Sequence, residues 1–315
     1  MTRAALPAVV FPRPRLAIGV AIPHYGLDSN VETIEAAVEV AERLGWTGGA
    51  WVQDHLLVEP ASRDPYGRVF EAMATLAFVA GRTSSIVLGT SVIVPPMRDA
   101  ILLAKEIASL DALTRGRLIV GVGAGWDAAE FENLGQADRF PTRGAYLDET
   151  IALWRHLWSG TPGGFEGRHI RVGAEVEFAP LPHRPGGPPI WVGGRSGAAY
   201  RRAGRVGDGF HSGELMDGPT GYVAAARAVS AAAAEAGRPV PPLSARLNVR
   251  FGREHGWRRF AIDGAPSDLA LGLERFRDLG VSHVVLNFGL HDPDALAATM
   301  EQFDAQVVRA LPDAG

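Results

Sequence analysis

Short runs of apolar residues alternate along this chain with longer segments in which apolar residues recur every three or four positions. The run LAIGVAI at 16–22 predicts a buried strand, and the segment at 31–45 that follows has the spacing of an amphipathic helix. The same strand-then-helix unit occurs eight times. The predicted strands are 16–22, 50–53, 85–94, 117–123, 189–194, 208–212, 245–251 and 281–288. The predicted helices are 31–45, 70–81, 100–113, 144–158, 196–205, 219–236, 267–279 and 293–309.

The eight units predict one α/β domain that covers residues 1–315. Continuously apolar strands that alternate with amphipathic helices form parallel sheets covered by helices. Eight such units close into a (β/α)8 TIM barrel, which we take as the predicted fold. An open, doubly wound sheet is the alternative that this pattern leaves.

Two segments fall outside the repeated pattern. Residues 1–14 form a predicted N-terminal arm, and residues 160–189, between the fourth and fifth strands, contain 13 Gly or Pro among 30 residues. We interpret this second segment as an insertion with a hairpin around 168–178. Long loops in compact domains often serve as lids or binding loops, so the same role is expected here.

Composition excludes several classes of protein and site. The chain has 47% hydrophobic residues, 21% charged residues and a net charge of −4, which favours a globular protein and not a partner of nucleic acid or of acidic membranes. The absence of cysteine excludes disulfides, thiolate nucleophiles and thiolate metal ligands. With no secretory signal and no apolar run long enough for a membrane helix, we expect a cytoplasmic protein that acts on a small molecule.

Polar, glycine and aromatic residues gather where the predicted strands end. The carboxyl ends of barrel strands face one opening, which is where barrel enzymes carry their chemistry. The residues at these ends are His24, Asp54, His55, Ser91, Gly123, Ala124, Gly125, Trp126, Gly193, Gly194, Arg195, Ser196 and His211. The sequence therefore predicts a pocket at this face, in which a carboxylate and imidazoles meet aromatic side chains.

The stretch VGGRSGAAYRRAGRVGDG at 192–209 is the clearest candidate for an anion site. Gly193 and Gly194 end a strand, Arg195 adds a positive charge, and Ser196 stands where a helix begins. Glycine allows a ligand to approach the backbone closely, and the free N–H groups of a helix N-terminus favour a phosphate. The alternative is an ordinary helix capped by serine.

Three motifs in this order resemble the bacterial-luciferase-like superfamily of flavin and deazaflavin enzymes. They are WVQDHL, LGTSVIVPPMRDAILLAKEIASLDALTRGRLIVGVGAGWDAAEF and PPIWVGGRSGAAYRRAGRVGDGF, and the resemblance runs from about residue 16 to 290. The chain is most similar to the branch that uses coenzyme F420. The resemblance implies a (β/α)8 barrel with an insertion, a homodimer, and a non-proline cis peptide at Ser91–Val92 behind the cofactor ring.

The resemblance also implies roles for single residues. His55 would exchange a proton next to a hydride transfer, and Asp54 would hydrogen-bond the ring system or orient the site. The turn at Gly123, Ala124 and Gly125 would pass beside the cofactor, and residues 193–196 would hold its phosphate.

The predicted substrate pocket contains Trp126, His24 and His211. Trp126 stands where the sugar-phosphate dehydrogenases of the family carry a glutamate, which argues against sugar-phosphate oxidation. Trp51 and Phe210 are expected to pack in the core. The pocket thus offers aromatic and imidazole groups to an organic substrate.

The predicted function is hydride transfer between F420 and an organic substrate, with His55 as the catalytic residue. An FMN-dependent monooxygenase is the alternative within the family. Two further classes remain: a metal-dependent barrel hydrolase with ligands His24, Asp54, His55 and His211, and a binding protein without catalysis. The sequence does not identify the substrate or the direction of the reaction.

Overall fold

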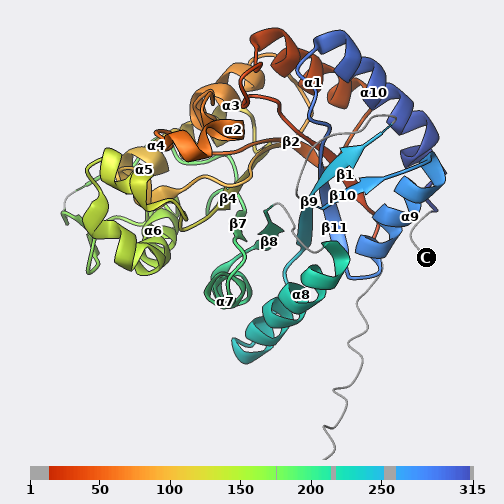
Figure 1. Cartoon of the computed structure of the whole chain (residues 1–315). Coiled ribbons are helices and arrows are strands. Elements are labelled where there is room, and N and C mark those ends of the chain that lie inside the picture. Colours follow the sequence, from red (N-terminus) through yellow and green to blue (C-terminus); the bar gives the residue numbers. More distant parts are fainter. Residues whose placement is uncertain (1–13, 175, 214–217, 252–259, 313–315) are drawn as a thin grey trace, which may run out of the picture.

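The protein forms a closed parallel β-barrel surrounded by helices, as a computed structural model shows for residues 14–174, 176–213, 218–251 and 260–312 (Figure 1). The barrel strands are β1 (Ala17–Ala21), β2 (Gly49–Val52), β3 (Leu88–Thr90), β4 (Leu118–Val122), β7 (Ile190–Gly193), β8 (Gly209–Ser212), β9 (Leu243–Arg250) and β11 (Val281–Asn287). β8 pairs with β9, and β9 pairs through β11 with β1, so the sheet has no open edge between its first and last strands. The predicted (β/α)8 barrel is confirmed, and the open doubly wound sheet is excluded.

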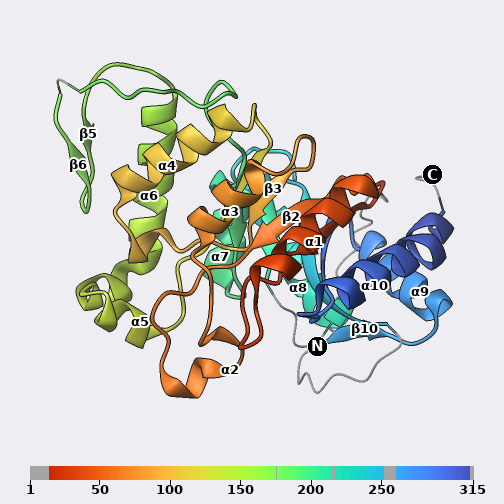
Figure 2. The ribbon, with the colours of Figure 1, turned by 90° about the horizontal axis from the view of Figure 1, so that it is seen from above.

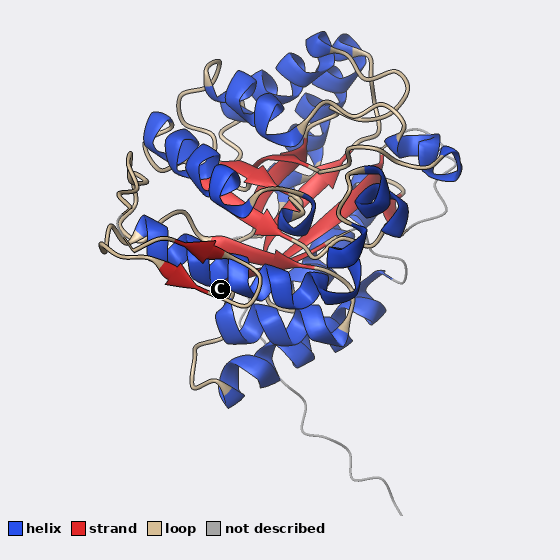
Figure 3. Cartoon of the chain, turned by 90° about the vertical axis from the view of Figure 1, so that its left-hand side faces the viewer, coloured by secondary structure: helices blue, strands red, loops and turns tan. Residues whose placement is uncertain are grey.

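The predicted helices are present and cover the outside of the barrel (Figure 3). They are α1 (Val31–Arg43), α3 (Ala72–Ala80), α4 (Ala100–Leu113), α6 (Arg143–Trp158), α7 (Gly197–Val206), α8 (Gly218–Glu235), α9 (Pro266–Arg277) and α10 (Pro293–Gln306). Side-chain caps fix several of their N-termini: Asn30, Asp99 and Asp292 each accept a hydrogen bond from the first turn of the helix that follows. No helix among the described residues is long and apolar enough to cross a membrane.

Short elements that the sequence pattern does not predict lie between these units. Helices α2 (Arg63–Tyr66) and α5 (Ala128–Asn133) follow β2 and β4, and strand β10 (Ala261–Asp263) pairs with β9. Short 3₁₀ helices lie at Pro60–Ser62, Pro95–Met97, Ala137–Thr142 and Val308–Ala310. Helix α5 lies in the loop that leaves the carboxyl end of β4, so it helps to shape the barrel mouth.

The segment at 160–189 packs against the outer helices. It contains the hairpin of β5 (Phe165–Glu166) and β6 (Arg171–Val172), which begins earlier than the predicted hairpin at 168–178. Glu149 of α6 accepts hydrogen bonds from the backbone between these strands, and Asp111 of α4 accepts one from Arg184 N. Figure 2 shows β5 and β6 next to α6. The segment is held there, and none of its described residues lines the pocket at the mouth, so its role as a lid or binding loop stays a prediction.

The barrel interior changes from apolar to polar toward its mouth. Ala21, Trp51, Ile119, Trp191 and Val285 form an apolar cluster inside the barrel. Phe210 is fully buried in the main core between barrel and helices, so both Trp51 and Phe210 pack in the core as expected.

Of the predicted N-terminal arm at 1–14, residues 1–13 lie outside the described residues.

Candidate active site

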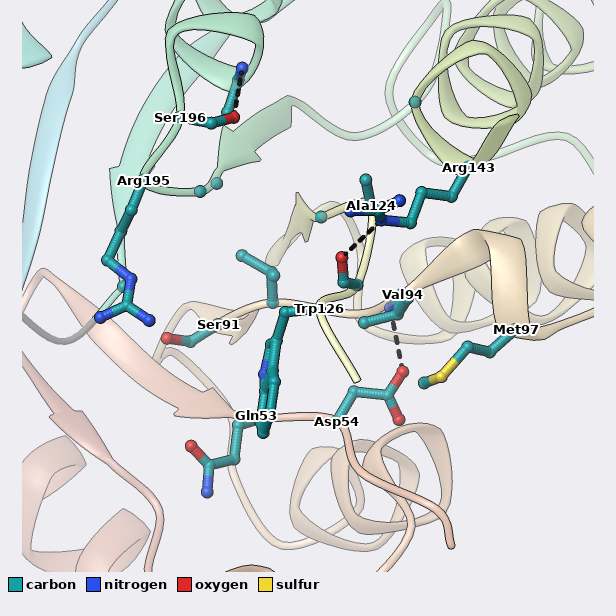
Figure 4. Close-up of a pocket in the computed structure, with 18 of the residues that line it drawn as sticks. Gln53, Asp54, Ser91, Val94, Met97, Ala124, Trp126, Arg143, Arg195 and Ser196 are labelled. Carbon is teal, nitrogen blue, oxygen red and sulfur yellow. Dashed lines mark hydrogen bonds between the residues drawn. The ribbon is translucent and has the colours of Figure 1, made fainter. Parts of the chain in front are cut away.

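A cavity of about 790 Å³ lies at the carboxyl ends of β2, β3, β4 and β7 (Figure 4). Twelve of the residues predicted for the site line it: Asp54, His55, Ser91, Val92, Gly123, Ala124, Gly125, Trp126, Gly193, Gly194, Arg195 and Ser196. The barrel thus brings together residues from four separate stretches of sequence, as the convergence of strand ends requires. The volume of the cavity is in the range of pockets that hold cofactors and substrates.

His55 is held on one edge and open toward the cavity on another. Its Nδ1 lies 2.8 Å from Oε2 of Glu130, and its ring lies 4.2 Å from that of Tyr66 and 5.8 Å from that of Trp126, centroid to centroid. A carboxylate can only accept, so Nδ1 carries the proton in this contact. In the neutral ring, Nε2 is then the basic atom, which suits His55 to take up a proton from a substrate or to return it.

Glu130 is the main site residue that sequence reasoning missed. It is almost fully buried in α5, and its Oε1 accepts a second hydrogen bond, 2.7 Å long, from Leu56 N. Burial acts to raise the pKa of Glu130, but the bonds from His55 and from the backbone outweigh it and lower this pKa. A carboxylate four residues beyond Trp126 was the available signal. The sequence alone does not show that α5 lies next to the end of β2, so this carboxylate could not be assigned to His55.

Asp54 binds the loop after β3. Its Oδ2 accepts a 2.9 Å hydrogen bond from Val94 N, and its Oδ1 lies 2.6 Å from Nη2 of Arg98, which also contacts Glu71. Burial raises the pKa of Asp54 to about 6, against the lowering effect of Arg98 and of the Val94 amide. Both oxygens therefore hold neighbouring protein groups, which supports the predicted orienting role.

The peptide bond between Ser91 and Val92 is cis, as the resemblance implies. The Val92 side chain fills the space above two glycines: a Cβ at Gly123 or at Gly193 would lie 2.6 Å from a Val92 methyl group. These glycines are therefore needed for the close approach of Val92. At Gly193, the close approach that the sequence predicts for a ligand is thus made by the Val92 side chain.

Residues 193–196 lead into helix α7 at the edge of the cavity. Ser196 caps the helix by accepting a 3.3 Å bond from Ala199 N, and the exposed Arg195 side chain extends away from this N-terminus (Figure 4). Arg202, in the same helix, also lines the cavity and is bonded to Asp148. Serine capping and anion binding are compatible here, because the cap uses one of several N–H groups at the helix N-terminus.

Two residues predicted for the substrate pocket lie beneath it instead. His24 is fully buried, with Nδ1 2.9 Å from Ile22 O and Nε2 2.9 Å from Gln53 O. His211 is also fully buried: its Nε2 bonds Ser91 Oγ at 2.7 Å, and its ring stacks on Trp51. His211 stacks on Trp51 of the apolar cluster inside the barrel, so it lies below the layer of side chains that lines the mouth. A position near a strand end therefore does not by itself place a group in the mouth.

The arrangement also separates the four proposed metal ligands. The ring nitrogens of His24 and His211 are used by backbone and serine groups, and Asp54 is engaged by Arg98. In the part of the chain that the structure describes, no three His, Asp or Glu side chains form a group that could hold a metal ion. The hydrolase alternative therefore has no ligand set in this geometry.

Comparisons with known proteins agree with this fold. The model of the family described as luciferase-like monooxygenase matches residues 16–254. The F420-dependent glucose-6-phosphate dehydrogenase of Nocardia farcinica is 35% identical over 226 residues; the match covers 70% of this chain and 64% of the relative, just under two thirds of its length. Among solved structures, an F420-dependent secondary alcohol dehydrogenase has a TM-score of 0.78 at 18% identity, covering 95% of this chain and 100% of that one. The F420-dependent tetrahydromethanopterin reductase of Methanopyrus kandleri has a TM-score of 0.75 at 20% identity, with the same coverage. Because the family model matches well over half of the chain, this protein belongs to the luciferase-like monooxygenase family.

Proposed function

We propose that the protein is an F420-dependent oxidoreductase that transfers a hydride between the coenzyme and a small organic molecule. The observation that carries the proposal is His55, whose Nδ1 is bonded to Glu130 and whose ring lines the large cavity at the barrel mouth. The relative from Nocardia farcinica, named as an F420-dependent enzyme, supports the choice of cofactor. The protein is expected to act in the cytoplasm, and the family resemblance favours a homodimer.

The residues of the cavity fit a flat ring that carries a phosphate. The backbone around Gly194 and the first turn of α7 offer N–H groups and a partial positive charge, and Arg195 adds a full charge. Val92, with Gly123 and Ala124 beside it, forms a wall for the ring on the β3–β4 side. When bound, F420 supplies a carbon that accepts or donates a hydride.

The protein's own groups would control the proton that accompanies the hydride. His55 Nε2 takes the proton of a substrate hydroxyl in oxidation and returns it in reduction. Glu130 fixes the ring tautomer and stabilises the charged imidazole. Trp126, 58% exposed at the mouth, offers an apolar face to the substrate. By the family resemblance, Trp126 stands where the sugar-phosphate enzymes carry a glutamate, so we propose a substrate other than a sugar phosphate.

Cofactor titration tests the proposal directly. The apoprotein is titrated with F420 and, separately, with FMN, and binding is followed by the change in cofactor fluorescence. We expect F420 to bind at least tenfold more tightly, a difference of about 1.4 kcal/mol. Tighter binding of FMN would instead favour the flavin monooxygenase alternative, and binding of neither would contradict both.

Replacement Glu130→Gln should lower kcat about tenfold or more and leave KM nearly unchanged. His55 Nδ1 and Leu56 N each contact a different oxygen of Glu130, and in glutamine one of these two atoms is an NH2 group, which cannot accept. The loss of a charge-assisted bond costs about 1.5–3 kcal/mol. Steady-state kinetics with F420 measure the effect. Glu132→Gln, an exposed change in the same helix, is the matched control. An equal loss in both variants would show that α5 is merely destabilised.

A further inference from the structure

One wall of the cavity, next to His55, is apolar and largely aromatic. Tyr66, Val94, Met97 and Trp126 line the cavity there, and we call these four residues the apolar wall. The His55 ring is in contact with the rings of both Tyr66 and Trp126. Figure 4 shows Val94 and Met97 on the side of the cavity opposite Arg195, where the cofactor phosphate is placed under the proposed function.

Trp126 offers the largest open surface of this wall. Its side chain extends into the cavity toward Gln53 and Asp54 (Figure 4), yet the residue is 58% exposed. The turn before it is fixed: Gly125 has a φ of 83°, and a Cβ there would lie 2.9 Å from Val94. A flat indole that is held in place and open to solvent gains free energy when an apolar group covers it.

The polar side chains beside the apolar wall are already engaged. Both oxygens of Asp54 and both oxygens of Glu130 hold protein groups, as described above. Gln53 Oε1 accepts a 2.6 Å bond from Arg246, and its Nε2 is enclosed. His55 Nε2 has no partner in the described part of the chain, and it is not among the enclosed polar atoms. Of these four acceptor or donor side chains, only His55 offers an atom to a ligand.

This combination distinguishes two kinds of ring that could stack on Trp126. A sugar ring carries several hydroxyls, which lose water on binding and need hydrogen bonds in exchange. Arg143, which also lines the cavity, is used by the backbone oxygens of Gly125 and Phe140. An aromatic ring needs only the indole face, and a single hydroxyl or carbonyl beside that ring is matched by the single open atom of His55.

We propose that the substrate is an alcohol, or the corresponding ketone, with an aromatic ring next to the reacting carbon, and that Trp126 selects this ring. The ring stacks on the indole, and the hydroxyl donates to His55 Nε2. In oxidation the C–H bond of the alcohol carbon breaks, the hydride passes to F420, and the hydroxyl proton passes to His55 as the carbonyl forms. Reduction of the ketone is the reverse. The inference rests on the proposed function for the reaction, but binding can be measured without turnover.

The test compares three alcohols on the protein loaded with reduced F420, which cannot oxidise them: 1-phenylethanol, 1-cyclohexylethanol and D-glucose. The first two have the same carbon skeleton and hydroxyl, and they differ in whether the ring is flat. Calorimetry gives the affinities. We expect 1-phenylethanol to bind about fivefold more tightly than 1-cyclohexylethanol, the usual gain of an aromatic pair beyond its buried area. D-glucose should bind at least tenfold more weakly than either.

Two variants locate the effect. Trp126→Leu keeps an apolar side chain but removes the flat face, so it should abolish the preference for 1-phenylethanol and leave F420 affinity unchanged. Trp126→Phe should retain most of the preference. Phe78→Leu, which changes a 39% exposed aromatic ring of α3 that does not line the cavity, is the control and should alter none of the affinities.

The outcomes separate this inference from the proposed function. Equal or weaker binding of 1-phenylethanol relative to 1-cyclohexylethanol, or tighter binding of D-glucose, would overturn the inference. A preference that survives in Trp126→Leu would overturn the role of Trp126, and so would a loss of F420 affinity in that variant, by assigning the indole to the cofactor. Failure of the unmodified protein to bind F420 would refute the proposed function alone, since the three alcohols can also be titrated into the protein without cofactor.

Discussion

Replacement His55→Ala should lower the turnover number with F420 by roughly 10²–10⁴-fold, the usual contribution of a positioned general acid or base. The imidazole is bonded through Nδ1 to Glu130, and its ring is packed beside Tyr66, so the proton donor or acceptor is held in one orientation. Removal of the ring leaves only water to exchange the proton. Single-turnover kinetics, followed by F420 absorbance, measure this step directly.

The control for this experiment is His183→Ala, which removes an exposed imidazole from the segment packed on the outer helices. We expect no change in turnover for that variant. F420 affinity should also be nearly unchanged in His55→Ala, because the phosphate is assigned to residues 193–196. An unaltered turnover number in His55→Ala would refute the catalytic assignment, whereas lost F420 binding would point to a role in holding the cofactor.

Acidification should reduce the free energy of unfolding steeply between pH 6.5 and pH 4. Burial lowers the pKa of His24 to about 4 and that of His283 to about 4. Burial also lowers the pKa of His211 to about 3, and the nearby charges of Arg246 and His283 act in the same direction. Three imidazoles thus resist protonation in the folded state.

The sign of the effect follows from the comparison with the unfolded chain, where histidine titrates near pH 6.5. Above that pH, both states hold these rings neutral. Below pH 6.5, the unfolded chain binds protons at these rings and the folded state does not. The free energy of unfolding therefore falls until the pH reaches the folded-state pKa values. At about 1.4 kcal/mol per pKa unit, His24 alone removes about 3 kcal/mol by pH 4. Asp54 offsets a smaller part of this loss of stability between pH 6 and pH 4. Because its pKa is raised in the folded state, the folded protein binds this proton before the unfolded chain does.

Urea unfolding followed by tryptophan fluorescence at half-unit steps from pH 8 to pH 4 measures this dependence. The variant His211→Asn should show a shallower decline, whatever its stability at pH 8, because one proton-linked group has been removed. The exposed change His183→Asn should leave the slope unaltered. A stability that stays constant from pH 7.5 to pH 5 would contradict the burial of neutral imidazoles.

The regular elements of the fold could be predicted closely from local patterns. The predicted helix at 100–113 coincides with α4, and the predicted strand at 117–123 contains β4. Apolar periodicity and helix caps act within a few residues, so they can be read along the chain. The short elements α2 and α5 are set by tertiary packing and were not predicted.

The sequence by itself determined the eight strand–helix units and the stretches whose ends meet at the mouth, because strand order and the parallel arrangement follow from the alternation of elements. Only the tertiary structure decided which side chains enter the cavity. It placed His24 and His211 beneath the cavity. It brought Glu130 to His55 across 75 residues of chain, and Arg246 to Gln53 across 193 residues. Such pairings depend on how strands from distant parts of the sequence lie side by side, and no local pattern encodes that contact.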